Sequence, residues 1–350
     1  MNHGTMSYML VMSVTAISCR GPVSKDADPT CVQEQAWTGM PGSLAEWGRT
    51  KNGVFAVLDP SDSEEDALLV WQWQRGLLKR TDVFQLPRSV DVTPAADGIC
   101  GLHMKKTNGQ WPYVLLKLSD KRILKEWEFS GLNIAKTSVS DDGNTVALFA
   151  ENDVSSGNFA ESGRVAMVDV KSKELTWISD LEGRGTDTVR QVIMSDDKRY
   201  MAVAGWGDGV AMTDVGDKKS LWNKRPGSIS YAVFSKDSKS LFAGGTEGCV
   251  YSMDVKTGAV LKRRWAAPTN EAIYGHRISA LAISADGKWL AAGTGPEGRV
   301  YLWNLVTDKR WTVNHGLGSI LVLAFSPDSD RLASIGDGVL KVWQLATQAP

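Results

Sequence analysis

The sequence predicts an all-β fold, a single closed β-propeller of seven four-stranded blades. Three observations predict it: an acidic turn between two apolar strands recurs along the chain, a second strand marker recurs with the same count, and Gly and Trp are abundant. The 350 residues include 34 Gly and 14 Trp, against 7 Tyr and 8 Phe. This composition is typical of many short strands joined by tight turns.

The first marker is the acidic turn. Asp tolerates turn conformations and accepts bonds from nearby backbone N–H groups, while Gly supplies positive φ at low cost. The turns read PAADG, SDDG, SDDK, SKDS, SADG and SPDS, and their acidic residues are Asp97, Asp142, Asp197, Asp237, Asp286 and Asp328. They are 40 to 55 residues apart, and Asn52-Gly53 begins a further unit 45 residues before the first of them.

The second marker is the third strand of each unit, which follows the two apolar strands joined by the acidic turn. It reads VWQW, LLKL, MVDV, MTDV, SMDV, LWNL and VWQL, and a more polar fourth strand follows, as in KELTWIS from Lys173 or AVLKRRW from Ala259. Both markers count seven units, with a margin of one blade. A lone blade would leave its faces and edges uncovered, so the blades are expected to stack around an axis.

Two C-terminal units resemble WD repeats. Gly275-His276 takes the place of the GH dipeptide and Trp303-Asn304 that of the WD pair. The resemblance implies a hydrogen-bonded network within the blade, in which Glu297 stands where Asp is usual, and a platform that binds other proteins. The residues in network positions are His276, Thr294, Trp303, His315 and Trp343.

The middle units depart from the WD pattern. They keep the Asp but carry Val168, Thr213 and Met253 in place of the Trp. One of them, VYSMDVKTGAVLKR from Val250, is similar to the quinoprotein-type propeller repeat. The likeness to propeller repeats covers residues 42–345 and concerns the fold more than the function.

The last unit ends after its third strand, so a fourth strand must come from elsewhere. Residues 33–39, with EQAWT at their centre, precede the first complete unit and are expected to supply it, as in the ring closure of WD-repeat propellers. Closure of this kind removes two open sheet edges. We expect three regions: a signal peptide at 1–18, a flexible tether at 19–32 and the propeller domain at 33–350.

The N-terminal apolar run resembles a bacterial lipoprotein signal. Residues 8–18, YMLVMSVTAIS, have the length of a signal core and precede Cys19, the expected lipidation site. No Lys or Arg precedes the run, and Ala16 stands where Leu is usual. The resemblance implies a lipid-anchored protein of the cell envelope, or a secreted one. The alternative is a cytoplasmic protein with a disordered N-terminus and an unmodified cysteine.

Composition and motifs predict a protein that is not an enzyme. Lys plus Arg total 39 against 40 for Asp plus Glu, which favours neither nucleic acid nor an anionic membrane as a partner. Membrane attachment would depend on Cys19 alone. GxSxG, HExxH and P-loop motifs are absent from the sequence, so we expect no catalytic residue, no metal and no cofactor. Residues 293–298 match GxGxxG, but a strand follows them, where dinucleotide binding needs a helix.

Two functions remain consistent with these features of the sequence. The first is a protein-interaction scaffold whose partner binds aromatic residues on the loops between second and third strands. These residues are Trp111, Phe159 and Trp206, which come from consecutive units, and the alternative is that each packs over its own blade. The second is a lactonase-like propeller enzyme with a metal in the central channel, bound by residues near inner-strand starts such as Glu46, Asp91 and Asn133.

Overall fold

The computed structural model describes the chain between residues 28 and 345, with gaps. The described ranges are 28–36, 43–50, 53–59, 65–87, 89–94, 99–104, 112–128, 132–140, 142–152, 162–182, 189–205, 209–266, 276–316, 318–336 and 338–345. These ranges contain 28 strands and no helix. Within them, no helix has the length and apolar character that crossing a bilayer requires.

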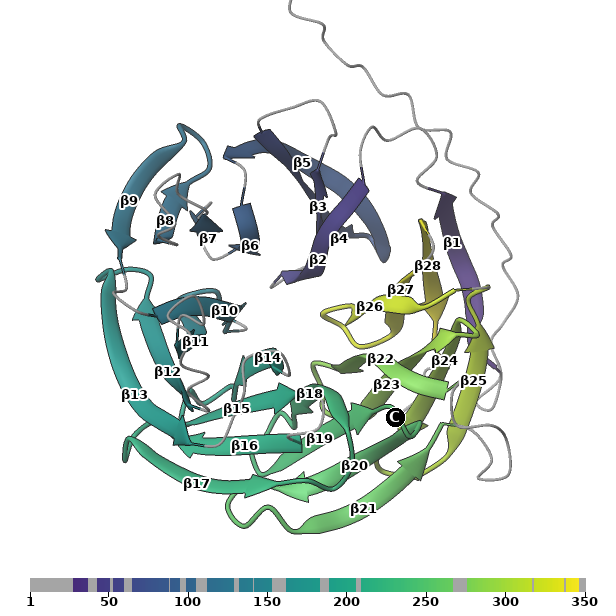
Figure 1. Cartoon of the computed structure of the whole chain (residues 1–350). Coiled ribbons are helices and arrows are strands. Elements are labelled where there is room, and N and C mark those ends of the chain that lie inside the picture. Colours follow the sequence, from purple (N-terminus) through teal and green to yellow (C-terminus); the bar gives the residue numbers. More distant parts are fainter. Residues whose placement is uncertain are drawn as a thin grey trace, which may run out of the picture.

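The strands form seven four-stranded antiparallel sheets arranged as blades around an axis (Figure 1). The predicted fold class and blade count are therefore confirmed. The first strand of each blade lies nearest the axis and contacts the first strands of both neighbours. Buried apolar side chains between adjacent sheets form the core, so each blade depends on the next one for its packing.

The first four blades each contain four consecutive strands. Their bounds are β2 (Ser43–Thr50), β3 (Gly53–Asp59), β4 (Glu65–Gln74) and β5 (Leu77–Pro87); β6 (Ser89–Pro94), β7 (Ile99–Met104), β8 (Tyr113–Lys117) and β9 (Arg122–Trp127); β10 (Leu132–Val139), β11 (Thr145–Asn152), β12 (Ser162–Asp169) and β13 (Glu174–Glu182); β14 (Val189–Met194), β15 (Tyr200–Gly205), β16 (Gly209–Asp214) and β17 (Lys219–Lys224).

Blades five and six are also consecutive, whereas blade seven combines the two ends of the chain. Their bounds are β18 (Ile229–Phe234), β19 (Ser240–Gly245), β20 (Cys249–Asp254) and β21 (Val260–Trp265); β22 (His276–Ile283), β23 (Trp289–Pro296), β24 (Arg299–Asn304) and β25 (Arg310–Asn314); β26 (Ile320–Phe325), β27 (Arg331–Gly336), β28 (Val339–Gln344) and β1 (Thr30–Ala36).

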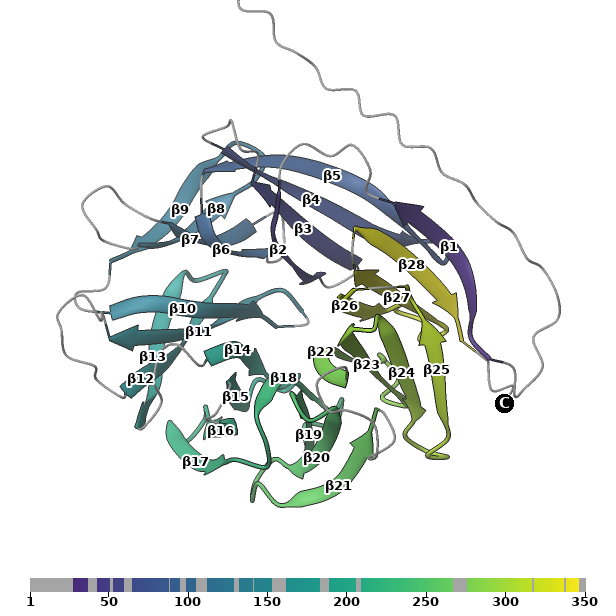
Figure 2. The same cartoon turned by 45° about the vertical axis from the view of Figure 1, so that its right-hand side comes forward.

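The ring is closed by β1, which pairs antiparallel with β28 (Figure 2). The predicted closing segment, 33–39, overlaps β1 but begins three residues later, and residues 37–42 lie outside the described ranges. The Gln33 amide crosses to the first blade: its Nε2 donates to Leu78 O at 2.9 Å, and its Oε1 accepts from Leu78 N at 3.0 Å. One side chain thus joins the closing strand to the neighbouring blade through two hydrogen bonds.

The acidic turns that mark the repeat close by local hydrogen bonds. In blade 3, Ser140 Oγ donates to Asp142 Oδ1 at 2.6 Å and accepts from Thr145 N at 3.0 Å. Asp142 Oδ1 also accepts from Asn144 N at 3.0 Å. The same Ser–Asp bond occurs in the turns that begin at Ser195, Ser235, Ser284 and Ser326. The motif is therefore a self-contained turn that fixes the first hairpin of a blade.

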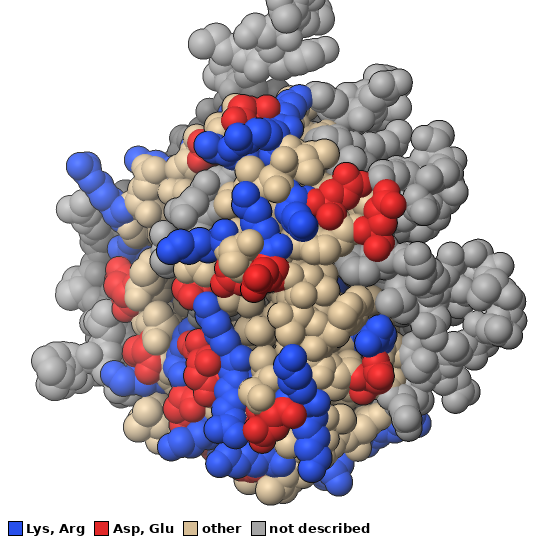
Figure 3. Space-filling model, turned by 90° about the vertical axis from the view of Figure 1, so that its left-hand side faces the viewer, with Lys and Arg blue, Asp and Glu red and all other residues tan. Residues whose placement is uncertain are grey.

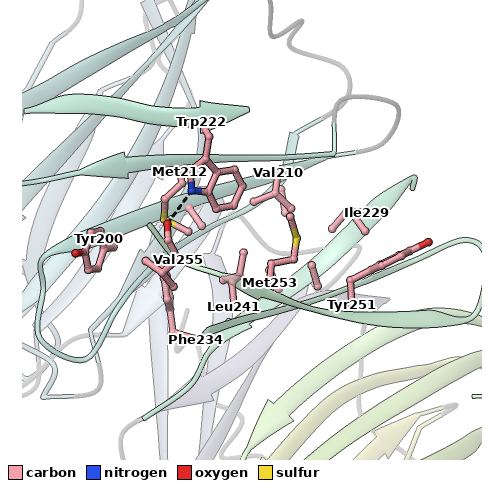
Figure 4. Close-up of a cluster of buried hydrophobic side chains, with 14 of the residues drawn as sticks. Tyr200, Val210, Met212, Trp222, Ile229, Phe234, Leu241, Tyr251, Met253 and Val255 are labelled. Atoms are coloured by element: carbon pink, nitrogen blue, oxygen red, sulfur yellow. Dashed lines mark hydrogen bonds between the residues drawn. The ribbon is translucent and has the colours of Figure 1, made fainter. Parts of the chain in front are cut away.

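The core between blades 4 and 5 shows how neighbouring sheets join (Figure 4). Trp222 lies on the outer strand of blade 4, and its Nε1 donates to Val255 O of blade 5 at 2.7 Å. Met212 and Met253, on the third strands of the two blades, are fully buried in the same cluster. An apolar interface with a satisfied indole N–H thus replaces the blade's own WD-type tryptophan in these middle units.

Candidate interaction face

The ring has two faces that differ in their connections. One face, which we call the turn face, carries the acidic turns between first and second strands. The opposite face, which we call the loop face, carries the connections between second and third strands and those that enter the first strand of the next blade. This follows from the antiparallel order of every sheet, because successive connections alternate between the two ends of the strands.

Each inner strand carries a β-bulge near the end where it leaves the loop face. Register shifts occur between residues 44 and 46, 89 and 91, 134 and 136, 189 and 191, 229 and 231, 278 and 280, and 320 and 322. A bulge bends its strand and redirects the extra side chain. Seven bulges therefore form a ring of redirected positions around the channel mouth.

Three polar side chains from consecutive blades lie near the loop-face ends of their inner strands, at this mouth. Arg190 is the bulge residue of β14 and is exposed, Tyr231 follows the bulge of β18 and is partly buried, and Arg277 near the start of β22 is exposed. Burial raises the pKa of Tyr231, and the positive charges of Arg277 and Arg190 oppose that rise. Both guanidinium groups therefore lie near enough to the phenol to act on it.

The sequence did not select Arg190, Tyr231 or Arg277. Their only sequence signal is a place one or two residues after an inner strand begins. The bulge that redirects Arg190 is defined by pairing with β15, so it becomes visible only in the register. Together they make the mouth of the channel basic along blades 4 to 6.

The predicted partner-binding residues Trp111, Phe159 and Trp206 lie outside the described residues. The strands on either side of them are described: β7 and β8, β11 and β12, and β15 and β16. These pairs belong to blades 2, 3 and 4, and each pair opens toward the loop face. The assignment of the three aromatic residues to one sector of partner contacts stays a prediction.

The last blade contains a polar network of three buried side chains, those of His315, Ser334 and Trp343. Ser334 is fully buried on β27; its Oγ accepts from Trp343 Nε1 at 2.7 Å and bonds His315 Nδ1 at 2.7 Å. His315 Nε2 lies 3.2 Å from Gly336 O. Desolvation lowers the pKa of His315 below its usual value, so the imidazole is neutral in this site. The network joins the connection into β26 with the second and third strands of the blade.

In blade 6 the predicted network residues contact other partners and not one another in the interactions that the structure shows. His276 is buried, with Nδ1 3.4 Å from Glu297 Oε2, and Arg299 Nε lies 3.3 Å from the same oxygen. Thr294 Oγ1 donates to Arg299 O at 3.2 Å. Trp303 is buried and stacks on Tyr301, with ring centroids 6.2 Å apart. Glu297 thus takes the acidic position beside the histidine.

The channel positions proposed for an enzyme are placed only by their backbones. Glu46, Asp91 and Asn133 lie on β2, β6 and β10, the inner strands of three consecutive blades. The described residues contain no group of three or more His, Cys, Asp or Glu side chains that could hold a metal. The GxGxxG match ends β23 and is followed by β24, so a strand occupies the place of the phosphate-binding helix.

Three further side chains that can carry chemistry, those of His103, Cys100 and Cys249, lie on strands in the core. His103 lies on β7, the second strand of blade 2, and is buried. Cys100 and Cys249 are fully buried, and burial raises the pKa of the Cys249 thiol to about 11. A thiol in this environment is a packing residue with little thiolate at neutral pH.

Cys19 and the predicted signal and tether up to residue 27 lie outside the described residues, so lipidation of Cys19 stays a prediction.

Two segments of the chain match the WD domain, G-beta repeat family, at residues 269–304 and 309–344. These segments contain blade 6 and most of blade 7, including the histidines and tryptophans of both networks. The chain is also 30% identical over 131 residues to the U3 snoRNP-associated protein-like YAOH of Oryza sativa subsp. japonica, covering 34% of this chain and 25% of that protein.

Other relatives show a similar partial coverage. SEC12-like protein 2 of Arabidopsis thaliana is 36% identical over 115 residues, which cover 31% of this chain and 27% of that protein. Periodic tryptophan protein 2 homolog of Mus musculus is 32% identical over 69 residues, 19% of this chain and 8% of that protein. The chain matches about a quarter or less of the length of these relatives.

These relatives correct the expected location. The predicted cell-envelope or secreted location is wrong, because the rice protein and a second plant relative, of Arabidopsis thaliana, are named for association with the U3 snoRNP, an intracellular ribonucleoprotein. The cytoplasmic alternative fits the relatives better.

Proposed function

Because this chain is a WD-repeat β-propeller, we propose that it is a non-catalytic scaffold that binds a protein partner on its loop face. WD-repeat propellers bind protein partners, and the coverage of the relatives makes the identity of any partner a separate question. The observation that carries the proposal is the basic channel mouth beside three consecutive loop-bearing blades. A rigid ring holds these elements in fixed positions, which lowers the entropic cost of binding.

Two features of the proposed site favour a protein over a small substrate. Arg190 and Arg277 lie on blades 4 and 6, with Tyr231 of blade 5 between them, so their charges are spread along the mouth. Arg and Tyr are enriched where interfaces gain most of their binding energy, since both combine large apolar area with polar atoms. A partner with acidic side chains fits this arrangement.

The test compares two multiple variants with wild type in affinity capture from the native host. The first variant carries Trp111→Ala, Phe159→Ala and Trp206→Ala, and the second carries Arg190→Ala and Arg277→Ala. Both should keep the wild-type circular dichroism spectrum and melting temperature and lose the same specific partner. Loss by only one variant would restrict the contact to the loops or to the mouth.

A matched control removes two exposed cations from the turn face. Lys171 and Lys218 lie in turns between third and fourth strands, so Lys171→Ala with Lys218→Ala leaves the loop face unchanged. Retention of partners by this control and by both test variants alike would refute the proposal. Stoichiometric metal in the purified protein would contradict the non-catalytic assignment and favour the channel enzyme instead.

A further inference from the structure

The outer strand of blade 5 differs from the other outer strands in its exposed side chains. Six large apolar side chains are well exposed among the described residues, and four of them lie on β21 or on the turn beside it: Val260 (40%), Leu261 (60%), Trp265 (40%) and Val306 (71%). The other two, Val83 and Ile123, are on separate blades. An exposed apolar cluster of this kind marks an interaction site.

The exposure of Leu261 comes from a bulge that most blades share. β21 pairs Lys262 with Ser252 and Val260 with Met253, which leaves Leu261 as the extra residue. The corresponding extra residues on β13 and β17 are Ile178, which is buried, and Leu221, which is partly buried. The same bulge thus buries or partly buries an apolar side chain in blades 3 and 4, whereas in blade 5 it exposes one to solvent.

The cluster is surrounded by positive charge. Lys262 and Arg264 share one carboxylate, that of Asp308, with Arg264 Nη2 3.4 Å from Asp308 Oδ1. Arg263 lies on the other side of the strand, with its guanidinium 5.7 Å from the Tyr251 ring centre. Arg310 Nη1 donates to Trp265 O at 3.0 Å.

The balance of charge here differs from that of the whole protein. Around β21, the five cations Lys256, Lys262, Arg263, Arg264 and Arg310 lie with three carboxylates, those of Asp254, Asp308 and Glu247, the last of which accepts from Tyr251 Oη. Asp254 already bonds Thr257 N and Oγ1 in the adjoining turn. On the side of the ring shown in Figure 3, Lys and Arg lie interspersed with Asp and Glu. The excess of cations at β21 is therefore local, since the full chain carries a net charge of −1.

We propose that β21 is a second interface, where an extended acidic segment of another protein adds as a fifth strand to blade 5. β21 ends its sheet, so one row of its backbone N–H and C=O groups faces outward and can pair with an added strand. Six residues of β21 offer about 20 Å of edge. The surface lies on the circumference of the ring, and the inference is independent of the loop face.

The side chains define what the added segment must carry. Arg263 and Trp265 share one side of β21 by the two-residue period of a strand, and Lys262 and Arg264 share the other. An apolar residue of the added strand would cover Leu261 or Trp265, and acidic residues would pair with Arg263 and Lys262. A second copy of this chain is disfavoured because its own β21 would place like charges opposite each other.

The experiment measures binding of a fluorescein-labelled peptide of alternating apolar and acidic residues, about seven residues long to match the edge. Fluorescence anisotropy gives its Kd for wild type, Leu261→Asp and Arg263→Glu. Each variant should bind at least about tenfold more weakly, and higher salt should weaken wild-type binding. Ile123→Asp is the matched control, because Ile123 is an exposed apolar residue on the outer strand of blade 2, and it should keep the wild-type Kd.

Hydrogen exchange tests the mode of binding. Strand addition predicts slower exchange of the amides of residues 260–265 when peptide is present, and exchange at the loop face should not change. Equal affinity for wild type and Leu261→Asp, or protection elsewhere, would overturn the proposal. So would preferential binding of single-stranded RNA or of anionic phospholipid vesicles at β21, or a concentration-dependent dimer that Leu261→Asp abolishes. Unchanged melting temperatures show that the variants are folded.

Discussion

Replacement of Ser334 by alanine should strongly destabilise the fold, although it removes only one oxygen atom. Ser334 is fully buried, and its hydroxyl bonds two other buried groups, Trp343 Nε1 and His315 Nδ1, each at 2.7 Å. Both partners belong to other segments of the last blade. The hydroxyl is therefore the shared point of a network that holds three segments together.

The magnitude follows from what the substitution leaves behind. A buried polar group that loses its partner costs about 1–3 kcal/mol. Two such groups are left in Ser334→Ala, although His315 keeps its contact with Gly336 O at 3.2 Å. We therefore expect a loss of about 2–5 kcal/mol in the free energy of unfolding.

Equilibrium unfolding in urea, followed by Trp fluorescence, measures this loss. The midpoint should fall while the slope m stays constant, because the amount of surface exposed on unfolding is unchanged. Ser220→Ala is the control, since Ser220 is exposed on an outer strand, and its effect should stay within about 0.5 kcal/mol. A Ser334→Ala protein as stable as this control would refute the argument that the network is a structural unit.

Three further predictions concern closure, packing and titration. Deletion of residues 31–39 should cause aggregation or a large fall in melting temperature, because β28 loses its partner strand. Gln33→Ala should give a smaller fall, because it removes two hydrogen bonds to Leu78. An unchanged melting transition in the deletion variant would place ring closure elsewhere. Trp303→Ala should cost about 3–5 kcal/mol in urea unfolding, and normal stability would mean that this side chain is not packed. Burial lowers the pKa of His315 below 6.5, so the stabilising contribution of the neutral imidazole is complete above that pH and is lost as pH falls through the folded-state pKa. The free energy of unfolding should therefore decrease from pH 8 to pH 5. The variant His315→Gln should show a smaller decrease over the same range.

A fourth prediction concerns the N-terminus. If Cys19 is lipidated, intact-mass spectrometry of the native protein should show a cleaved chain that begins at a modified Cys19. A product that retains Met1 and an unmodified Cys19 would end this prediction.

Some features of the last blade could be predicted from local sequence patterns, and others depended on the fold. His315 and Trp343 are recognisable because their spacing follows from strand and turn lengths that are local. Their partner Ser334 was not selected, since serines are common on these strands and only the fold shows which one lies between the two rings. Counting strands identified the closing segment, but the strand itself begins at Thr30, three residues before the predicted start at residue 33.

The sequence by itself determined the number of blades and the place of each first hairpin. Its acidic turns are closed by bonds between residues two to five apart, such as Ser140 with Asp142 and Thr145, so the turn chemistry is written in adjacent letters. Tertiary structure decided which side chains line the channel mouth and which are exposed on the outer strands at the circumference of the ring. Arg190 and Leu261 owe their positions to bulges in strand register and to packing between blades, and these depend on contacts between residues far apart in the chain.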